Sequence, residues 1–330
     1  MARTGVSVAL GTMALLVGLA AAGAGGAAAP SAAAPAASLE PVRVFVSVLP
    51  QAWFVQRIGG LRIEVHVLVG PGQSPHTFEP TPRQMAALAA ARLFFTTGWP
   101  FETQVLEKAR SINPALEVID LRQGIPLRRV TGDETGQGGE DKDEGRRAGE
   151  PDPHIWLSPR LAAIQAARIA QVLTTADPDR AAEFQKNLET LQDDLRRTDE
   201  RLARALAPLR GQTFFVFHPA FGYFADAYGL RQRAVEVEGK EPTARQLADL
   251  IDKARASGVR IIFVQPQFST KSAEAVARAI QGAVVPMDDL AQDYLANLEA
   301  MADKIVQALQ PETPARRGGP ARPAGKDAKP

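Results

Sequence analysis

The sequence predicts an α/β protein built from two parallel-sheet lobes that a single long rigid helix joins. In both halves of the chain, short β-branched and aromatic runs such as residues 42–48 and 213–217 alternate with amphipathic helical segments. This alternation indicates parallel sheets with helices on their faces. Between the halves, residues 178–206 repeat apolar side chains at intervals of three, four and seven, which is typical of an amphipathic helix. At about 1.5 Å per residue it would be roughly 40 Å long, so we expect it to connect the lobes.

The first half is expected to contain four strands and four helices. Gly59-Gly60 and Pro71-Gly72 interrupt the chain between them, and Thr81 and Ser158 stand at helix N-cap positions, each followed by proline. We expect strands at residues 42–48, 62–69, 93–96 and 116–119, and helices at 51–58, 82–91, 102–110 and 158–173.

The second half repeats the pattern after the long helix, for which Asp177 is the expected cap. We expect strands at residues 213–217, 231–237, 261–264 and 283–285, and helices at 219–228, 243–256, 272–280 and 290–309. The predicted domain organisation is a signal peptide with an Ala-rich region (1–37), an N-terminal metal-binding lobe (42–176), a linking helix (177–210), a C-terminal lobe (211–310) and a disordered tail (311–330).

Composition narrows the functional classes. The chain has 330 residues, 45% of them hydrophobic and 23% charged, which is ordinary for a soluble globular protein of one or two domains. Its formal net charge is +1, which provides no electrostatic basis for binding nucleic acid. It contains no cysteine, which excludes disulfides, thiolate nucleophiles and zinc–cysteine sites. Any site for a transition metal must therefore use histidine and carboxylate.

The N-terminus is typical of a secretory signal. Arg3 supplies a positive charge, residues 6–19 are mostly apolar, and an Ala/Gly-rich stretch follows. The alternative is an uncleaved anchor, but a membrane span needs about 20 apolar residues. A different segment, residues 131–150, holds six glycines and seven acidic residues, and we expect it to be a mobile loop.

Three of the four histidines occupy similar positions beside proline. His76 lies in SPHTFEPTP, His154 in DPHIWLSP, and His218 in FHPAFGYFADAYGL directly after a predicted buried strand. Ligands of open parallel sheets gather at the carboxyl ends of strands. Each histidine alone could be a surface or capping residue, but together they indicate a shared metal. His66 lies inside the strand EVHVLV and is expected to be structural.

With these histidines in view, the chain resembles the metal-binding solute receptors of ABC importers, the zinc and manganese cluster (cluster A-I) of periplasmic binding proteins. The matching stretches are SVLPQAWFVQRIGG, LVGPGQSPHTFEPTP, DPHIWLSP, FHPAFGYFADAYGL and EGKEPTARQL, and the resemblance extends over residues 42–309. It implies two α/β lobes bridged by a rigid helix, with a metal held between them.

The resemblance also implies the ligands. The first lobe would supply His76 and His154 and the second His218, and a carboxylate in VVPMDDLAQ, aligned on Asp288, would complete the site. Asp289 or a water molecule remains open for that fourth position. Manganese members typically carry glutamate where this chain has His218, and imidazole suits zinc, so we expect Zn²⁺ as transported cargo with Mn²⁺ as the alternative. The loop before His154 lacks the histidines that zinc members often carry.

The expected function is therefore capture of a divalent metal in the periplasm by a soluble monomer. Its partners would be a membrane permease of an ABC transporter and its cytoplasmic ATPase, with no nucleic acid. Two other functional classes are compatible with such a site, a surface adhesin or chelator and a zinc hydrolase. The hydrolase would use Glu79 as acid or base, but the H-E-x-x-H motif is absent and Asp288 would close the open coordination position, so we expect no enzyme.

Overall fold

The computed structural model describes residues 41–131, 149–235, 244–256 and 258–310. The predicted signal segment, nearly all of the 131–150 loop, the first part of EGKEPTARQL and the predicted tail lie outside the described residues. Among the residues that are described, no helix has both the length and the apolar character needed to cross a membrane.

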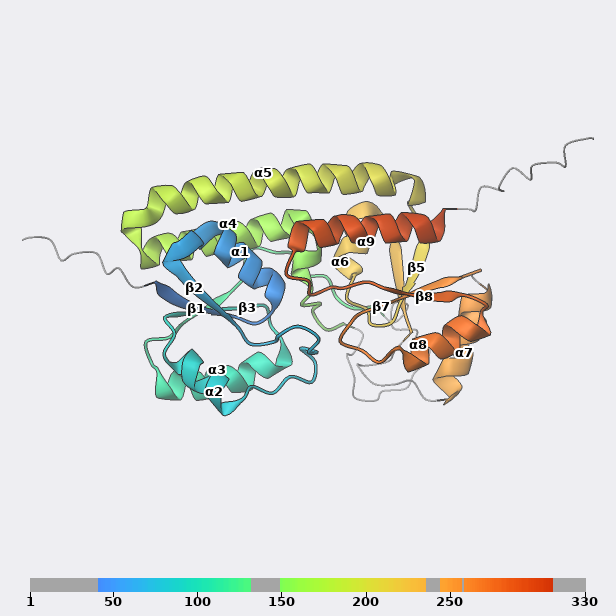
Figure 1. Ribbon diagram of the computed structural model, residues 1–330, viewed down its shortest axis with the longest axis horizontal. Coiled ribbons are helices and arrows are strands. Elements are labelled where there is room, and N and C mark those ends of the chain that lie inside the picture. Colours follow the sequence, from blue (N-terminus) through green and yellow to red (C-terminus); the bar gives the residue numbers. More distant parts are fainter. Residues whose placement is uncertain (1–40, 132–148, 236–243, 257, 311–330) are drawn as a thin grey trace, which may run out of the picture. The chain divides into compact units, whose positions relative to one another are not determined.

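The first lobe is a four-stranded parallel sheet with the strand order β2-β1-β3-β4 (Figure 1). Val44 in its central strand aligns with Val65 on one side and Leu93 on the other. The elements of this lobe are β1 (Val42–Val46), α1 (Leu49–Gly59), β2 (Ile63–Val67), α2 (Pro82–Ala89), β3 (Leu93–Thr96), α3 (Pro100–Ile112), β4 (Glu117–Asp120) and α4 (Pro159–Ala176).

The second lobe repeats this topology with the strand order β6-β5-β7-β8, also parallel throughout (Figure 1). Its elements are β5 (Thr213–Val216), α6 (Gly222–Tyr228), β6 (Arg231–Ala234), α7 (Ala244–Ala256), β7 (Ile261–Val264), α8 (Thr270–Ala279), β8 (Ala283–Pro286) and α9 (Tyr294–Leu309). In both sheets the earliest strand lies inside the sheet, so that successive connections leave it in opposite directions and open a crevice at its carboxyl end. The predicted fold class is confirmed.

The long helix α5 (Ala181–Leu206) connects the lobes. It packs against α1 and α4 of the first lobe and against α6 and α9 of the second (Figure 1). Its 26 residues would span about 39 Å, and one face of it is buried through Phe184, Leu188, Leu191, Leu195, Thr198, Leu202 and Leu206. These are the apolar positions that the sequence periodicity predicted, together with Thr198.

Helix caps agree with the sequence only in part. The Thr81 hydroxyl accepts the backbone N–H of Gln84, as expected for an N-cap. Ser158 stands at the N-cap of α4, but its side chain makes no capping hydrogen bond. Asp177 does not cap α5, because a 3-10 turn at Pro178–Arg180 intervenes and the Asp177 carboxylate lies 3.9 Å from the Arg62 guanidinium instead.

Within the described residues, the buried apolar side chains form two clusters. The larger extends from the first sheet through α4, α5 and α9 to one face of the second sheet, where Phe214 and Phe263 belong to it. The smaller lies on the other face of the second sheet and includes Phe215, Ile262 and Val276. Because apolar burial is the dominant favourable term in folding, the shared larger cluster joins both lobes through the long helix.

The loop between β3 and α3 is built around one buried carboxylate, that of Glu102, which is 3% exposed. Glu102 accepts four hydrogen bonds, from the Ser47 hydroxyl and from the backbone N–H groups of Thr97, Gly98 and Trp99. Burial raises the pKa of Glu102 above its ordinary value, although each of these donors acts to lower it. The carboxylate therefore fixes the loop that carries the buried Trp99 ring.

We predict that Glu102→Gln destabilises the protein by about 1–3 kcal/mol. Oε2 accepts two backbone N–H groups, and Oε1 accepts the Thr97 N–H and the Ser47 hydroxyl. An amide nitrogen cannot accept, but the Ser47 hydroxyl can turn and accept from it. The Thr97 N–H would then be left buried without a partner, at about 1–3 kcal/mol. Urea unfolding of both proteins measures the change. Glu107→Gln, on the exposed face of the same helix, is the matched control. Equal stability of the two variants would contradict this account of the loop.

Candidate metal centre

Three histidine side chains from distant parts of the sequence converge on one point. His76, His154 and His218 each offer one ring nitrogen, and these nitrogens all lie within 4.8 Å of one another. The Nε2 atoms of His76 and His218 are 2.9 Å apart. His154 and His218 are 1% and 2% exposed, whereas His76 is half-buried. The structure thus brings together the three histidines that the sequence singled out.

His76 lies in the loop between β2 and α2. Its backbone N–H donates to the Ser74 hydroxyl at 3.3 Å, and its ring meets the Trp99 ring edge-on, with 5.1 Å between centroids. Trp99 makes a similar contact with His154 at 5.3 Å. The Glu102 loop therefore places one indole between the two histidines of the first lobe, which limits the rotation of both rings.

His154 is oriented by Asp152, two residues before it. Asp152 Oδ1 lies 2.7 Å from His154 Nδ1 and 3.1 Å from the His154 backbone nitrogen, and the aspartate is fully buried. An ionised carboxylate can only accept, so Nδ1 carries the proton and Nε2 presents its lone pair to the cluster. A carboxylate behind a ligating histidine fixes ring orientation and raises the basicity of the ligand nitrogen.

The charge of Asp152 is balanced by Arg128. Its Nη1 lies 3.0 Å from Asp152 Oδ2, and its Nε donates to Asp226 of helix α6 in the second lobe at 2.9 Å. A Cβ on Gly222 would meet the Arg128 guanidinium at 1.9 Å, so glycine is what lets the guanidinium lie against α6. The Tyr223 hydroxyl donates to the Asp152 carbonyl at 3.1 Å, and burial raises the pKa of Tyr223 to about 12.

His218 lies two residues after the end of β5 and is held by Gln265, which directly follows the neighbouring strand β7. The Gln265 side-chain oxygen accepts the His218 backbone N–H at 3.2 Å, and its amide nitrogen donates to the His218 carbonyl at 2.8 Å. The Phe268 ring stacks on the imidazole, with 5.1 Å between centroids and 29° between planes. The side chain of Gln265 thus continues the hydrogen bonding between β5 and β7 beyond the ends of the two strands.

The two candidate carboxylates differ in position. Asp289 is 2% exposed, and its Oδ2 lies 4.0 Å from His154 Nε2. The Asp288 carboxylate instead accepts the backbone N–H of Leu290 at 2.8 Å, and burial raises its pKa. Neither aspartate belongs to the group of converging ligand atoms, which within the described residues contains the three histidines alone, but Asp289 is the one whose carboxylate comes near a histidine of that group. The geometry therefore favours Asp289 over Asp288, the residue aligned by resemblance.

His66 and Glu79 are not among the converging ligand atoms. His66 belongs to β2, where its Nε2 lies 2.8 Å from the Glu64 carboxylate and its ring stacks on Phe45. Glu79 is exposed.

The donor set suits a small, borderline-soft cation. Four ligands at 2.0–2.1 Å in tetrahedral geometry stand about 3.3–3.4 Å apart, which lies within the span of the three imidazole nitrogens. Imidazole is a ligand of zinc, copper and nickel, whereas manganese prefers carboxylate and water. The arrangement can therefore bind one transition-metal ion between the lobes.

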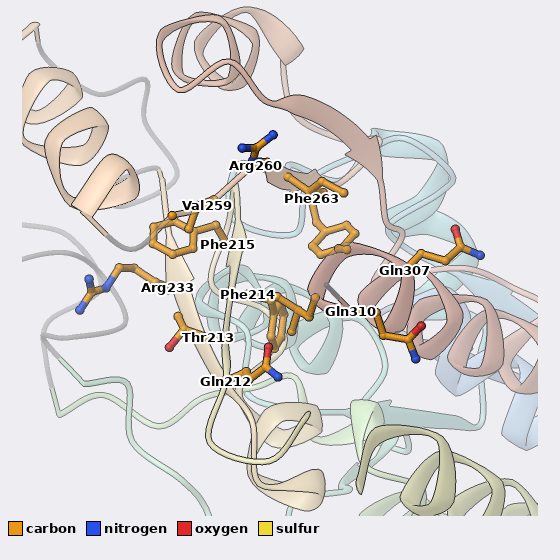
Figure 2. Close-up of a pocket in the computed structure, with 14 residues that line it drawn as sticks. Gln212, Thr213, Phe214, Phe215, Arg233, Val259, Arg260, Phe263, Gln307 and Gln310 are labelled. Carbon is orange, nitrogen blue, oxygen red and sulfur yellow. The ribbon is translucent and has the colours of Figure 1, made fainter. Parts of the chain in front are cut away.

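A separate open pocket of about 840 Å³ lies at the other edge of the second sheet, lined by the starts of β5 and β7 and the end of α9 (Figure 2). Phe214, Phe263, Arg260 and Gln307 are among its lining residues, and none of the 14 drawn in Figure 2 is histidine, aspartate or glutamate. His218 follows the opposite, carboxyl end of β5, so this pocket is not the metal centre.

Several residues around the histidines were not predicted from the sequence. The DPH motif contained Asp152, and an acidic residue just before a candidate ligand was the available signal. No sequence signal pointed to Arg128, Gln265 or Gln267, because each contacts a residue between 22 and 47 positions away. Such partners depend on which strands are neighbours in the sheet.

Comparison with known proteins agrees with this geometry. Residues 44–308 match the family of ZnuA, the periplasmic component A of the zinc-uptake complex. The high-affinity zinc uptake system protein ZnuA of Bacillus subtilis is 30% identical over 246 residues, which cover 73% of this chain and 76% of that protein. A crystal structure of ZnuA is 39% identical, with a TM-score of 0.73 over 82% of this chain and 99% of the other.

A longer relative is the zinc-binding lipoprotein AdcA of Streptococcus pneumoniae, which is 25% identical over 286 residues. The match covers 83% of this chain but only 57% of AdcA, so this chain spans little more than half the length of that relative. The fold, the converging histidines and the family match over residues 44–308 agree with one another. The chain therefore belongs to the ZnuA family of periplasmic zinc-uptake components.

Proposed function

We propose that this protein captures zinc in the periplasm between its two lobes and delivers it to the permease of an ABC importer driven by a cytoplasmic ATPase. The observation that carries the proposal is the convergence of three imidazole nitrogens within 4.8 Å. Family membership supports it, since the family is a zinc-uptake component rather than an enzyme. The predicted signal segment would direct the chain to the periplasm, where it would act as a monomer.

Asp289 is the proposed fourth ligand, in place of Asp288. A carboxylate at that position would give three neutral imidazoles and one anionic oxygen, a common tetrahedral zinc environment. Its Oδ2 is already 4.0 Å from His154 Nε2. The Trp156 indole N–H donates to the Asp289 carbonyl at 2.7 Å, and this contact supports the backbone that carries the carboxylate.

Release is proposed to follow from the division of ligands between lobes. His76 and His154 belong to the first lobe, and His218 and Asp289 to the second. A small displacement of the second lobe's loops would remove half of the coordination shell, which would convert tight binding into release at the permease. Manganese is less well supported as cargo because three of the four proposed donors are imidazoles.

We predict that the metal-free protein takes up one equivalent of zinc tightly, and that His76→Ala, His154→Ala and His218→Ala each weaken binding at least about 100-fold. Loss of even an outer-shell partner costs about 10–100-fold, and a direct ligand contributes more. Competitive titration against a chelator of known affinity, with metal content by mass spectrometry, measures both quantities.

His66→Ala is the matched control, because His66 pairs with Glu64 away from the cluster. Its zinc affinity should equal that of the unaltered protein. The proposal would be wrong if no variant changed zinc affinity, if His66→Ala weakened binding as much as the others, or if the protein preferred manganese.

A second prediction separates the neighbouring aspartates. Asp289→Asn should weaken zinc binding by about 10–100-fold, because it replaces an anionic ligand oxygen by a neutral one. Asp288→Asn should change it less than about twofold, since an asparagine oxygen can still accept the Leu290 N–H. Isothermal titration of both variants makes the comparison. A larger effect at Asp288 would restore the alignment-based ligand, and no effect at either would indicate water as the fourth ligand.

A further inference from the structure

A tight turn at residues 265–268 lies between the two strand ends that carry the second lobe's proposed ligands. In the sheet order β6-β5-β7-β8, strand β7 separates β5, which leads to His218, from β8, which leads to Asp289. The turn follows β7 and is closed by a backbone hydrogen bond from Phe268 to the Gln265 carbonyl at 3.1 Å. It is therefore placed to touch both ligands.

The side chains of this turn divide their contacts. Gln265 and Phe268 support His218, through the paired amide contact and the ring stack. Gln267 supports Asp289, because its side-chain N–H donates to Asp289 Oδ1 at 2.7 Å. The other carboxylate oxygen, Oδ2, is the one that lies 4.0 Å from His154 Nε2. The two oxygens of Asp289 thus have different neighbours.

We infer that Gln267 is a specificity-determining residue, which holds Asp289 as a one-oxygen ligand and so favours zinc over manganese. The inference rests on the proposed function and on Asp289 as fourth ligand. With Oδ1 held by the amide, Oδ2 alone faces the cluster, and the shell contains three nitrogens and one oxygen. Four-coordinate tetrahedral geometry suits zinc.

Manganese favours more oxygen ligands than a shell of three nitrogens and one oxygen provides. It favours carboxylate, carbonyl and water ligands in an octahedral shell, and the second oxygen of the proposed carboxylate ligand, Asp289 Oδ1, would supply one of them. Loss of the Gln267 donor would let the carboxylate rotate and offer both oxygens. The amide therefore discriminates by limiting coordination number, while the imidazoles discriminate by ligand type.

Gln267→Met tests the inference, because methionine keeps the length of the side chain and cannot donate. Zinc and manganese dissociation constants are measured by competitive titration for this variant and the unaltered protein. The ratio of the manganese constant to the zinc constant should fall about tenfold, the size expected for a hydrogen bond to a charged group. Gln307→Met, an exposed glutamine on the opposite edge of the sheet, should leave the ratio unchanged.

A double-mutant cycle distinguishes positioning from a general structural role. If Gln267 acts through Asp289, then Gln267→Met should not change the ratio further in an Asp289→Asn background. Cobalt(II) supplies a spectroscopic readout, since four-coordinate cobalt absorbs visible light far more strongly than six-coordinate cobalt. The cobalt-loaded Gln267→Met protein should absorb more weakly than the unaltered protein.

An unchanged ratio in Gln267→Met, or an equal change with and without the Asp289 carboxylate, would overturn the inference and leave zinc capture intact. Failure of the unaltered protein to bind zinc tightly would overturn the proposed function and the inference with it. The two failures are distinguished by the unaltered protein alone.

Discussion

Two lobes can share one metal ion only if donor atoms from both are held a few ångströms apart, and the ends of the parallel strands meet that constraint here. His218 lies two residues after β5, and the loops after β2 and β4 lead to His76 and His154. Because each sheet directs its carboxyl edge toward a crevice, residues far apart in sequence arrive at one point. The apolar core that both lobes share along α5 connects the two sheets.

The candidate metal centre also depends on the pairing of a buried charge, that of Asp152. Asp152 has no exposed side-chain surface, and its charge is balanced by Arg128 at 3.0 Å. Removing one partner of such a buried pair typically costs about 3–5 kcal/mol, because the other charge is left buried and uncompensated. Arg128 also reaches Asp226 on α6, which begins four residues after His218 in the chain. The group that orients His154 is therefore linked to the segment that follows the second lobe's histidine.

Much of this arrangement could be predicted from the residues. Apolar runs and glycine or proline breaks were enough to predict the β-strands and α-helices of the described residues to within a few residues at their ends, because those signals are local, whereas the short 3-10 helices were not predicted. The motifs around His76, His154 and His218 identified the cluster. Asp288 and Asp289 could not be separated, because a motif match leaves a one-residue ambiguity and adjacent side chains in extended backbone point to opposite sides.

The supporting contacts needed the fold itself. Gln265 and His218 are 47 positions apart and meet because β5 and β7 pair in the sheet. The helix caps also depended on contacts that only the fold creates. Asp177 lies beside the guanidinium of Arg62, a residue distant in the sequence, and does not cap the long helix. Local propensity sets where elements form, and tertiary neighbours decide what their polar side chains do.

The most direct test of the account is a crystal structure of the zinc-loaded protein, with the ion located by anomalous scattering at the zinc absorption edge. The account predicts one strong peak, with the Nε2 atoms of His76, His154 and His218 and Asp289 Oδ2 each about 2.0–2.1 Å from it. A peak elsewhere, a shell that lacks any of the three histidines, or no ordered zinc would contradict it.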